Sequence, residues 1–269
     1  MKLKLFYKFL ILMFVVVNGL YSKEYIIKKI SMDNSFFLNL DPNHSQWNKI
    51  NAKKIELMPQ NITTPSLQKR TVPYVVFKSF HNGEYIAFLL EWLDPTKNDF
   101  VDTDRASDAC AIQFPRGDFN STSPFMGHEG SAVVIFHWKA VWNRDVEKGF
   151  VDLEQIYPNV FTETYMFGKN IAKEARNPLS QDKRETPAEQ LTAMGFGTST
   201  HSENPEIRAW GIKTEKGWKV MFSYKIDTEL LPNLKPNSKT GIGFAIWGGN
   251  NGDIGARKNY TPWNEIKIE

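Results

Sequence analysis

Ten short segments with the composition of β-strands, each bounded by turn-forming residues, constrain the fold of this 269-residue chain most strongly. They are rich in β-branched and aromatic residues, and no regularly spaced helical segments alternate with them. The pattern predicts an all-β fold, an antiparallel β-sandwich of the carbohydrate-binding-module or immunoglobulin-like type. The segments are Tyr25–Ile30, Ala52–Leu57, Tyr74–Phe80, Glu84–Trp92, Ala109–Phe114, Ser131–Lys139, Glu206–Lys213, Trp218–Tyr224, Gly241–Trp247 and Glu265–Glu269.

The sequence predicts two β-hairpins and one long irregular segment. His81-Asn82-Gly83 and Glu215-Lys216-Gly217 each join two neighbouring strands, and Asn-Gly is the strongest short hairpin signal. Asn143–Pro205 has weak periodicity, and within it we expect short helices at Val151–Ile156 and Pro187–Met194. Irregular segments of this length often build a binding surface.

Residues 1–22 have the form of a secretory signal peptide. Lys2, Lys4 and Lys8 precede an apolar core over Phe9–Val17, and the small residue Ser22 could precede the cleavage site. The apolar run is short for a membrane span, although an uncleaved N-terminal anchor is the alternative. No twin-arginine pair is present, which indicates export by the Sec route. We expect residues 23–269 to form a single β-sandwich domain.

Removal of residues 1–22 leaves a chain that is formally neutral. The signal peptide carries three of the 33 basic residues and none of the 30 acidic ones. The excess of basic residues, which would be the main argument for nucleic-acid binding, therefore disappears. Cys110 is the only cysteine, so the chain can form no internal disulfide and cannot attach a c-type haem through CxxCH. A buried, unreactive thiol is the expected state of Cys110.

A methionine in a polar loop is unusual. Pro115–Gly130 is rich in Gly, Pro, Ser and Asn, and Met126 lies within it. Such a methionine fills the edge of a core or a partner surface, or its thioether binds a soft metal or haem iron. These alternatives stay open on the residue alone.

Other candidate sites receive less support. No GxSxG motif indicates a serine hydrolase. Asp99, Asp102, Asp104 and Asp108 are closely spaced and could bind calcium, but they lack the EF-hand order, and a solvated acidic loop is the preferred interpretation. The five histidines, His44, His81, His128, His137 and His201, show no zinc-ligand spacing. His137, on a predicted strand, competes with Met126 as a candidate iron ligand.

A glycine-rich loop follows the strand Gly241–Trp247. Gly248, Gly249, Gly252 and Gly255 allow tight turns or a close approach of the backbone, and Lys258 follows them. A solvated side chain is the default for a loop lysine.

Several motifs together resemble those of one family. DACAIQFP, PFMGHEG, FHWKA, AMGFGT, GWKVMFSY and GFAIWGGNNGDIGARKNYTPW occur in this order, and LDPNHSQWNKI and EWLDPTKNDF fit as well. The chain is similar over nearly all of residues 23–269 to the haem-binding γ subunits of type II DMSO-reductase-family molybdoenzymes. These enzymes include ethylbenzene dehydrogenase, dimethylsulfide dehydrogenase, selenate reductase and chlorate reductase.

This resemblance implies a β-sandwich that encloses one non-covalent haem b with Met/Lys axial ligation. The methionine corresponds to Met126 of PFMG and the lysine to Lys258; the adjacent Arg257 is a poor ligand because it stays protonated. Sulfur ligation tends to raise the reduction potential, and a lysine binds iron only when deprotonated. With both axial positions filled, such an iron suits electron transfer rather than substrate chemistry.

The implied function is that of a non-catalytic, periplasmic b-type cytochrome subunit. Its implied partners are an iron–sulfur β subunit, a molybdenum-containing α subunit, and a c-type cytochrome or similar carrier. The alternative is an exported carbohydrate-binding-like sandwich without haem, which uses tryptophans as a sugar platform.

Overall fold

The computed structural model describes residues 24–100, 105–151, 153–159, 184–202, 206–226 and 229–269. The predicted signal peptide lies outside these ranges, as do Asp102, Asp104 and part of the long irregular segment. In the described part of the chain, no helix has the length and apolar character needed to cross a membrane.

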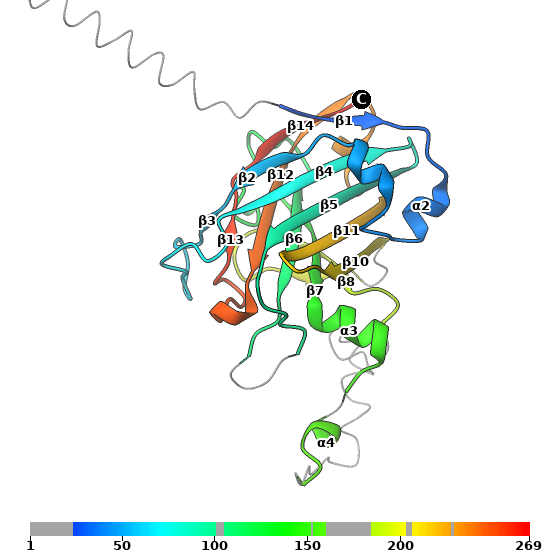
Figure 1. Cartoon of the computed structure of the whole chain (residues 1–269). Helices are drawn as coiled ribbons and strands as arrows, with labels where there is room; N and C mark the ends of the chain where they lie inside the picture. The colour runs from blue at the N-terminus through cyan, green and yellow to red at the C-terminus, as the bar shows by residue number, and fades with distance from the viewer. Residues whose placement is uncertain (1–23, 101–104, 152, 160–183, 203–205, 227–228) are drawn as a thin grey trace, which may run out of the picture.

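Most of the described chain is β-structure, arranged as a curled, two-layered sheet (Figure 1). One layer has the order β10-β11-β5-β4, with β2 paired to β4; the other has the order β14-β12-β6-β7-β8-β9, with β13 and β3 at the side of β12. The strands are β1 Tyr25–Lys29, β2 Lys53–Glu56, β3 Met58–Pro59, β4 Tyr74–His81, β5 Tyr85–Leu93, β6 Ala109–Pro115, β7 Val133–Lys139, β8 Ala188–Ala193, β9 Thr200–His201, β10 Ile207–Lys213, β11 Gly217–Lys225, β12 Ser238–Trp247, β13 Asn259–Tyr260 and β14 Asn264–Ile268. The α-helices are α2 Asn34–Leu38, α3 Ala140–Lys148 and α4 Leu153–Ile156.

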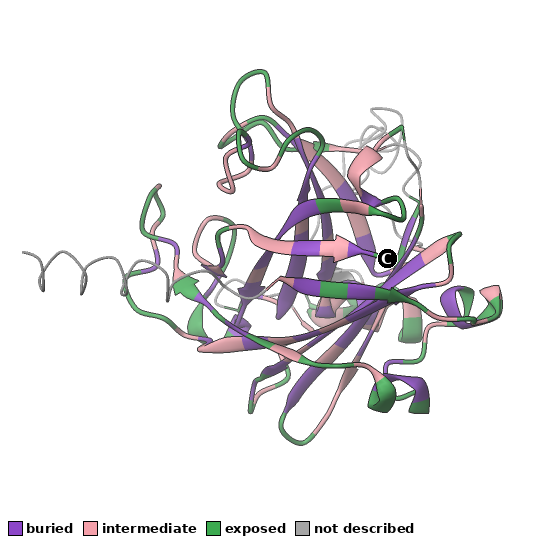
Figure 2. Ribbon diagram, turned by 90° about the horizontal axis from the view of Figure 1, so that it is seen from above, coloured by how far each residue is buried: buried purple, intermediate pink, exposed green. Residues whose placement is uncertain are grey.

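The main core lies between the two layers, where buried residues gather (Figure 2). Aromatic side chains from the two layers meet there: the ring centroids of Phe77 and Phe244 are 5.0 Å apart, and those of Phe88 and Phe114 are 5.5 Å apart. Each large ring removes 150–250 Å² of mostly apolar surface from water (roughly), so this aromatic interior accounts for much of the stability. The predicted β-sandwich is confirmed.

The first strand departs from the predicted antiparallel arrangement. β1 pairs in parallel with β14 through Tyr25–Ile27 and in parallel with β4 through Lys28 and Lys29. One short strand thus belongs to both layers. At the opposite end of the strand order, β10 lies beside β8, so the curled sheet nearly meets itself.

All ten predicted strands are present, as are both hairpins. The predicted helix at Pro187–Met194 is wrong, because these residues form β8, which pairs with β7. Ala, Glu, Gln and Leu favour helix, but the hydrogen-bonding edge of β7 overrides that weak preference. Helix α4 lies within the helix predicted at Val151–Ile156, whereas α2 and α3 were not predicted from the sequence.

Candidate cofactor site

The outer face of the second layer carries a shallow floor of small side chains. Successive residues of a strand point to opposite faces, so Cys110 and Ile112 enter the main core while Ala109 and Ala111 face outward. Ala245 of β12 is in register with Ala111, and Gly243 is in register with Gln113. Small residues at these positions leave space above the sheet that bulkier side chains would fill.

The loop that contains Met126 lies against one side of this floor. Met126 has a φ of +65°, in the left-handed region that non-glycine residues rarely adopt. Its carbonyl accepts a hydrogen bond from the backbone N–H of Gly195 (2.8 Å). A side chain cannot be accommodated at the next residue, Gly127, because its Cβ would stand 2.5 Å from the carbonyl oxygen of Ser131. Surrounding contacts therefore hold Met126 in a strained backbone conformation.

Side chains from the floor and the C-terminal region fix the same loop. The Gln113 amide donates to the carbonyl of Pro124 (2.9 Å), and the Trp263 indole donates to the carbonyl of Thr122 (2.8 Å). Phe125 packs edge-on against Tyr260 of β13, with ring centroids 5.5 Å apart. The methionine side chain is therefore positioned by the sheet rather than by its loop alone.

Lys258 reaches the same place from the glycine-rich loop. Its Nζ lies 4.0 Å from the Sδ of Met126 and 5.2 Å from the ring centroid of Trp247. Part of the Lys258 side chain is exposed, but burial around its nitrogen lowers its pKa to about 8. The two candidate haem ligands of the sequence analysis thus lie next to each other, and Lys258 is not the fully solvated lysine that residue type alone suggests.

Two buried carboxylates hold the glycine-rich loop. The Asp108 carboxylate accepts hydrogen bonds from the backbone of Gly249 (2.8 Å), the backbone of Asn98 (2.8 Å) and the indole of Trp218 (2.9 Å). Burial, together with the negative charge of Asp94, raises the pKa of Asp108 to about 6. Asp253 similarly accepts from the backbone of Gly248 (3.1 Å). These contacts set the direction in which Lys258 leaves the loop.

The interpretation of Asp108 as part of a solvated acidic loop is therefore wrong, because this residue is fully buried. Its three hydrogen-bond donors replace the water that a solvated carboxylate would bind. Asp99 is partly exposed and forms an ion pair with Lys97 at 2.8 Å. Within the described ranges, no group of three or more His, Cys, Asp or Glu side chains is arranged to hold a metal ion.

Sequence reasoning missed two amides that build the lysine side of the site. Gln60 is buried, its amide donates to the carbonyl of Ala256 (2.9 Å), and its backbone N–H donates to the carbonyl of Lys258 (2.9 Å). Asn259, also buried, accepts hydrogen bonds from the backbone N–H groups of Thr71 and Val72 at 3.0 and 3.3 Å. Nothing in their sequence context separates these residues from ordinary loop amides.

The five histidines have separate surroundings. His44 caps a short helix by accepting from the backbone of Gln46, His81 is buried near the C-terminal strand, and His128 is exposed. His137 and His201 bind the two oxygens of one carboxylate, that of Glu189, each through Nδ1 at 2.7 Å. The His137 ring lies against Trp247, with centroids 5.1 Å apart. His137 thus lies beside the Met126–Lys258 pair but does not line the space between them.

The sole cysteine, Cys110, is fully buried in the main core, and burial raises its pKa well above the usual range. The prediction of a buried, unreactive thiol is confirmed.

Between the two loops is a cavity of about 60 Å³, lined by Ala111, Gly243, Ala245, Met126 and Lys258 among others. The side chains of Phe125 and Phe196 also line it, and Phe196 is exposed at a turn between two glycines of positive φ. Small-molecule sites typically measure roughly 300–1,000 Å³. A flat macrocycle at this position therefore requires these covering side chains to move outward.

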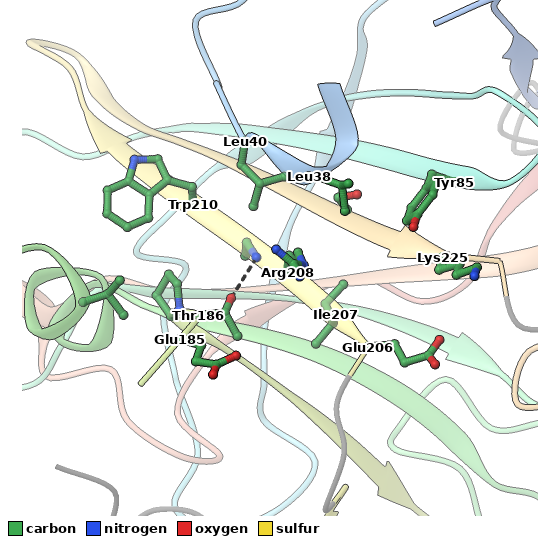
Figure 3. A pocket seen from close by; sticks show the side chains of 14 residues that line it. Leu38, Leu40, Tyr85, Glu185, Thr186, Glu206, Ile207, Arg208, Trp210 and Lys225 are labelled. Carbon is green, nitrogen blue, oxygen red and sulfur yellow. Dashed lines mark hydrogen bonds between the residues drawn. The ribbon is translucent and has the colours of Figure 1, made fainter. Parts of the chain in front are cut away.

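A larger cavity, of about 480 Å³, lies elsewhere, beside β10 and α2 (Figure 3). Trp210, Arg208, Tyr85 and Lys225 line it, and the backbone N–H of Ala209 donates to the hydroxyl of Thr186 at its wall. Six of the eight tryptophans are buried, and Trp263 packs on Gly241. Trp210 is therefore the one candidate among the described tryptophans for an accessible aromatic platform in this cavity.

Comparisons of structure give distant similarities. A family 9 carbohydrate-binding module from Caldicellulosiruptor kristjanssonii in complex with cellotriose is 12% identical, with a TM-score of 0.42, and the match covers 92% of this chain and 94% of that one. A putative carbohydrate-binding protein from Bacteroides uniformis ATCC 8492 is 8% identical, with a TM-score of 0.45, over 92% and 99% of the two chains. Similarity at this level does not identify a ligand.

Comparisons of sequence are more informative. The chain is 28% identical to the chlorate reductase subunit gamma of Ideonella dechloratans over 183 residues, which is 66% of this chain and 58% of the relative. It is 18% identical to a putative respiratory nitrate reductase heme subunit of Haloferax mediterranei, over 82% of this chain and 66% of the relative. The chain thus spans somewhat less than two thirds of each relative.

The family described as ethylbenzene dehydrogenase matches residues 44–259, a range that includes both Met126 and Lys258. The chain therefore belongs to the ethylbenzene dehydrogenase family, the γ-subunit family that its motifs resemble.

Proposed function

We propose that this chain is the electron-transfer subunit of a molybdoenzyme complex and carries one non-covalent haem b between Met126 and Lys258. The observation that carries the proposal is the convergence of these two side chains, with Sδ and Nζ 4.0 Å apart above a floor of small residues. Both donor atoms are close enough together to hold one metal ion.

The chemistry of the donors fits an iron porphyrin. A thioether binds soft metal ions without a change of protonation, whereas an amine must first lose its proton. The lowered pKa of Lys258, about 8, reduces the free energy needed to supply the neutral amine. The strained φ of Met126 adds support, because such strain often persists where a side chain is held for function.

A haem with both axial positions filled exchanges single electrons and has no position for substrate. The protein's own residues then have three tasks at this site. Met126 and Lys258 would hold the metal, the floor of Ala111, Gly243 and Ala245 would contact the flat apolar surface, and Phe125 and Phe196 would exclude water. Exclusion of water and sulfur ligation both favour the ferrous state.

Family membership and the N-terminal sequence support the remaining elements of the proposal. The partners are an iron–sulfur subunit and a catalytic molybdenum subunit, with a c-type cytochrome or similar carrier as the further electron partner. Substrate is transformed in the catalytic subunit. Lys2, Lys4 and Lys8 and the apolar run after them support export to the periplasm.

Reconstitution of the purified chain with haemin tests the proposal directly. We expect a Soret band, a six-coordinate low-spin spectrum, and release of all pigment into acid–acetone, since the chain offers no CxxCH for covalent attachment. A wild-type protein that takes up no haem, or that retains it after acid–acetone extraction, would contradict the proposal.

A second function, carbohydrate binding without haem, rests on the cavity that Trp210 lines (Figure 3). It requires neither Met126 nor Lys258. To test it, oligosaccharides are added to wild type and to Trp210→Ala, and tryptophan fluorescence is measured. Quenching in wild type but not in the variant would favour this function, provided that wild type also shows no haem spectrum after reconstitution.

A further inference from the structure

A basic and aromatic cluster lies along one edge of the small-residue floor. The register places Ala245, Ala111, His137 and Glu189 side by side across β12, β6, β7 and β8. The floor is therefore apolar at β12 and β6 and becomes polar at β7 and β8. We call the residues His137, Lys139, Arg184, Glu189 and His201 the basic rim.

Two tryptophan side chains lie between or against the residues of the basic rim and the site of Met126 and Lys258. The Trp247 ring lies between the Lys258 nitrogen, 5.2 Å from its centroid, and the His137 ring, 5.1 Å away. The Trp142 ring lies 4.4 Å from the Nζ of Lys139 and 4.1 Å from the guanidinium carbon of Arg184. The rim is thus next to the proposed cofactor site and is held in place by buried aromatic side chains.

Lys139 and Arg184 are the fixed cations of this cluster, and Asp145 also lies near Arg184. Glu189 is the single carboxylate of the rim, and its two oxygens already bind His137 and His201 at 2.7 Å. Among the residues that the structure describes, no carboxylate lies within 4.0 Å of the Lys139 nitrogen, whose charged neighbours are Glu189 and the like-charged Arg184. Burial also lowers the pKa of Lys139.

A partly buried cation without a close anion is unfavourable, and a bound carboxylate would stabilise it. The floor and the rim together match a flat apolar ring system that carries carboxylate groups at one edge. We propose that Lys139, supported by Arg184 and His137, binds the propionate carboxylates of the tetrapyrrole and so fixes its orientation on the floor. This inference rests on the proposed function.

Arg257 is the rival cation. It lies next to Lys258 and is partly buried, and its Nε has no hydrogen-bond partner. Burial raises the pKa of the nearby Asp253 carboxyl, and the charge of Arg257 opposes this rise, so Arg257 already has an anionic neighbour. The carboxylate near Lys139 is that of Glu189, whose two oxygens each lie 2.7 Å from a histidine nitrogen. Asp253 accepts only from neutral donors, so its charge remains available to Arg257, which favours the basic rim.

The test compares haem with its dimethyl ester, in which the propionates are uncharged. Dissociation constants for both pigments are measured by Soret titration of wild type and of Lys139→Met, which keeps a long side chain on Trp142. Wild type should bind haem at least about tenfold more tightly than the ester, because hydrogen bonds to charged groups are strong. In Lys139→Met this ratio should fall by about tenfold, with the six-coordinate low-spin spectrum retained.

Three further variants complete the experiment. Lys219→Met removes a strand lysine of the other layer, 3.8 Å from Glu91, and should leave the ratio unchanged. Lys139→Arg keeps the positive charge and should retain the ratio of haem affinity to ester affinity. This variant therefore distinguishes an effect of the lost charge from an effect of a disturbed fold. Three results would each overturn the inference. Wild type could bind haem and the ester equally tightly, Lys139→Met could keep the wild-type ratio of the two affinities, or Arg257→Met could lose that ratio instead. Failure of wild type to bind either pigment would instead reject the proposed function.

Discussion

The nitrogen of Lys258 lies 4.0 Å from the sulfur of Met126, although the two residues belong to loops on different strands. The methionine is held in a left-handed backbone conformation, and the lysine has its pKa lowered to about 8 by burial. Both features carry a free-energy cost, and under the proposed function the binding of a metal between the two donors would offset it.

Replacement of Lys258 by alanine should remove one axial ligand. We expect the haem of Lys258→Ala to become five-coordinate or water-ligated, which absorption and electron paramagnetic resonance spectra distinguish from a six-coordinate low-spin centre. Arg257→Ala is the matched control and should keep the low-spin spectrum, because a guanidinium stays protonated. An unchanged spectrum in Lys258→Ala would show that another residue binds the iron.

Replacement of Met126 by histidine should keep six-coordinate iron but lower its midpoint potential. Soft sulfur stabilises the ferrous state more than an imidazole nitrogen does. We expect a decrease of about 59 mV or more, equivalent to about 1.4 kcal/mol for one electron, in a redox titration. His137→Ala is the control. If it abolishes the low-spin spectrum while Met126→His leaves the potential unchanged, His137 is the ligand.

Two glycines near Met126 allow a matched comparison. Gly127 and Gly130 both have positive φ, +75° and +80°, so alanine strains the backbone at either position. A Cβ at Gly127 would also stand 2.5 Å from the Ser131 carbonyl, whereas nothing lies within 4 Å at Gly130. Gly127→Ala should therefore lower the free energy of unfolding by on the order of 1–3 kcal/mol more than Gly130→Ala in urea denaturation. Equal losses would show that the loop can shift freely, and that Met126 is not rigidly held.

Asp108 should make the stability of the protein depend on pH. Its folded-state pKa is raised to about 6 from 3.8, so the folded protein binds more protons than the unfolded chain between these values. The contribution of this group to stability should therefore rise as pH falls from about 7 to about 4. The free energy of unfolding is measured by urea denaturation at both pH values. On acidification, that of wild type should increase by on the order of 2–3 kcal/mol relative to that of Asp108→Asn. A wild-type-minus-variant difference that is constant with pH would indicate that Asp108 has an ordinary pKa.

The strands could be predicted from the sequence because a half-buried or fully buried strand leaves a local signature of apolar and β-branched residues. The β8 segment, AEQLTA, carries no such signature. Its conformation is decided by β7, whose unpaired edge accepts it, so local preference predicts the wrong element. The double pairing of β1 is likewise set by strands distant in the sequence.

The site could be predicted only in part, for similar reasons. Met126 and Lys258 were identified through motifs whose order resembles that of a known family, since a loop methionine or lysine alone permits several interpretations. Asp108 and Gln60 were not, because a polar residue in a loop is usually exposed. Their burial depends on donors from distant segments, such as Trp218 for Asp108. The small residues of the floor appear in the sequence as ordinary alternation within strands.

The parallel pairing of β1 has a consequence for the order of events during folding. Tyr25 is in register with Ile266, so β1 acquires its β14 neighbour only after more than two hundred further residues have been synthesised. The join between the two layers therefore consists of contacts at nearly the greatest sequence separation that the chain offers, and such contacts slow folding. The two layers can therefore be joined through β1 only when β4 and β14 are both available to it, which makes this join a late event in folding.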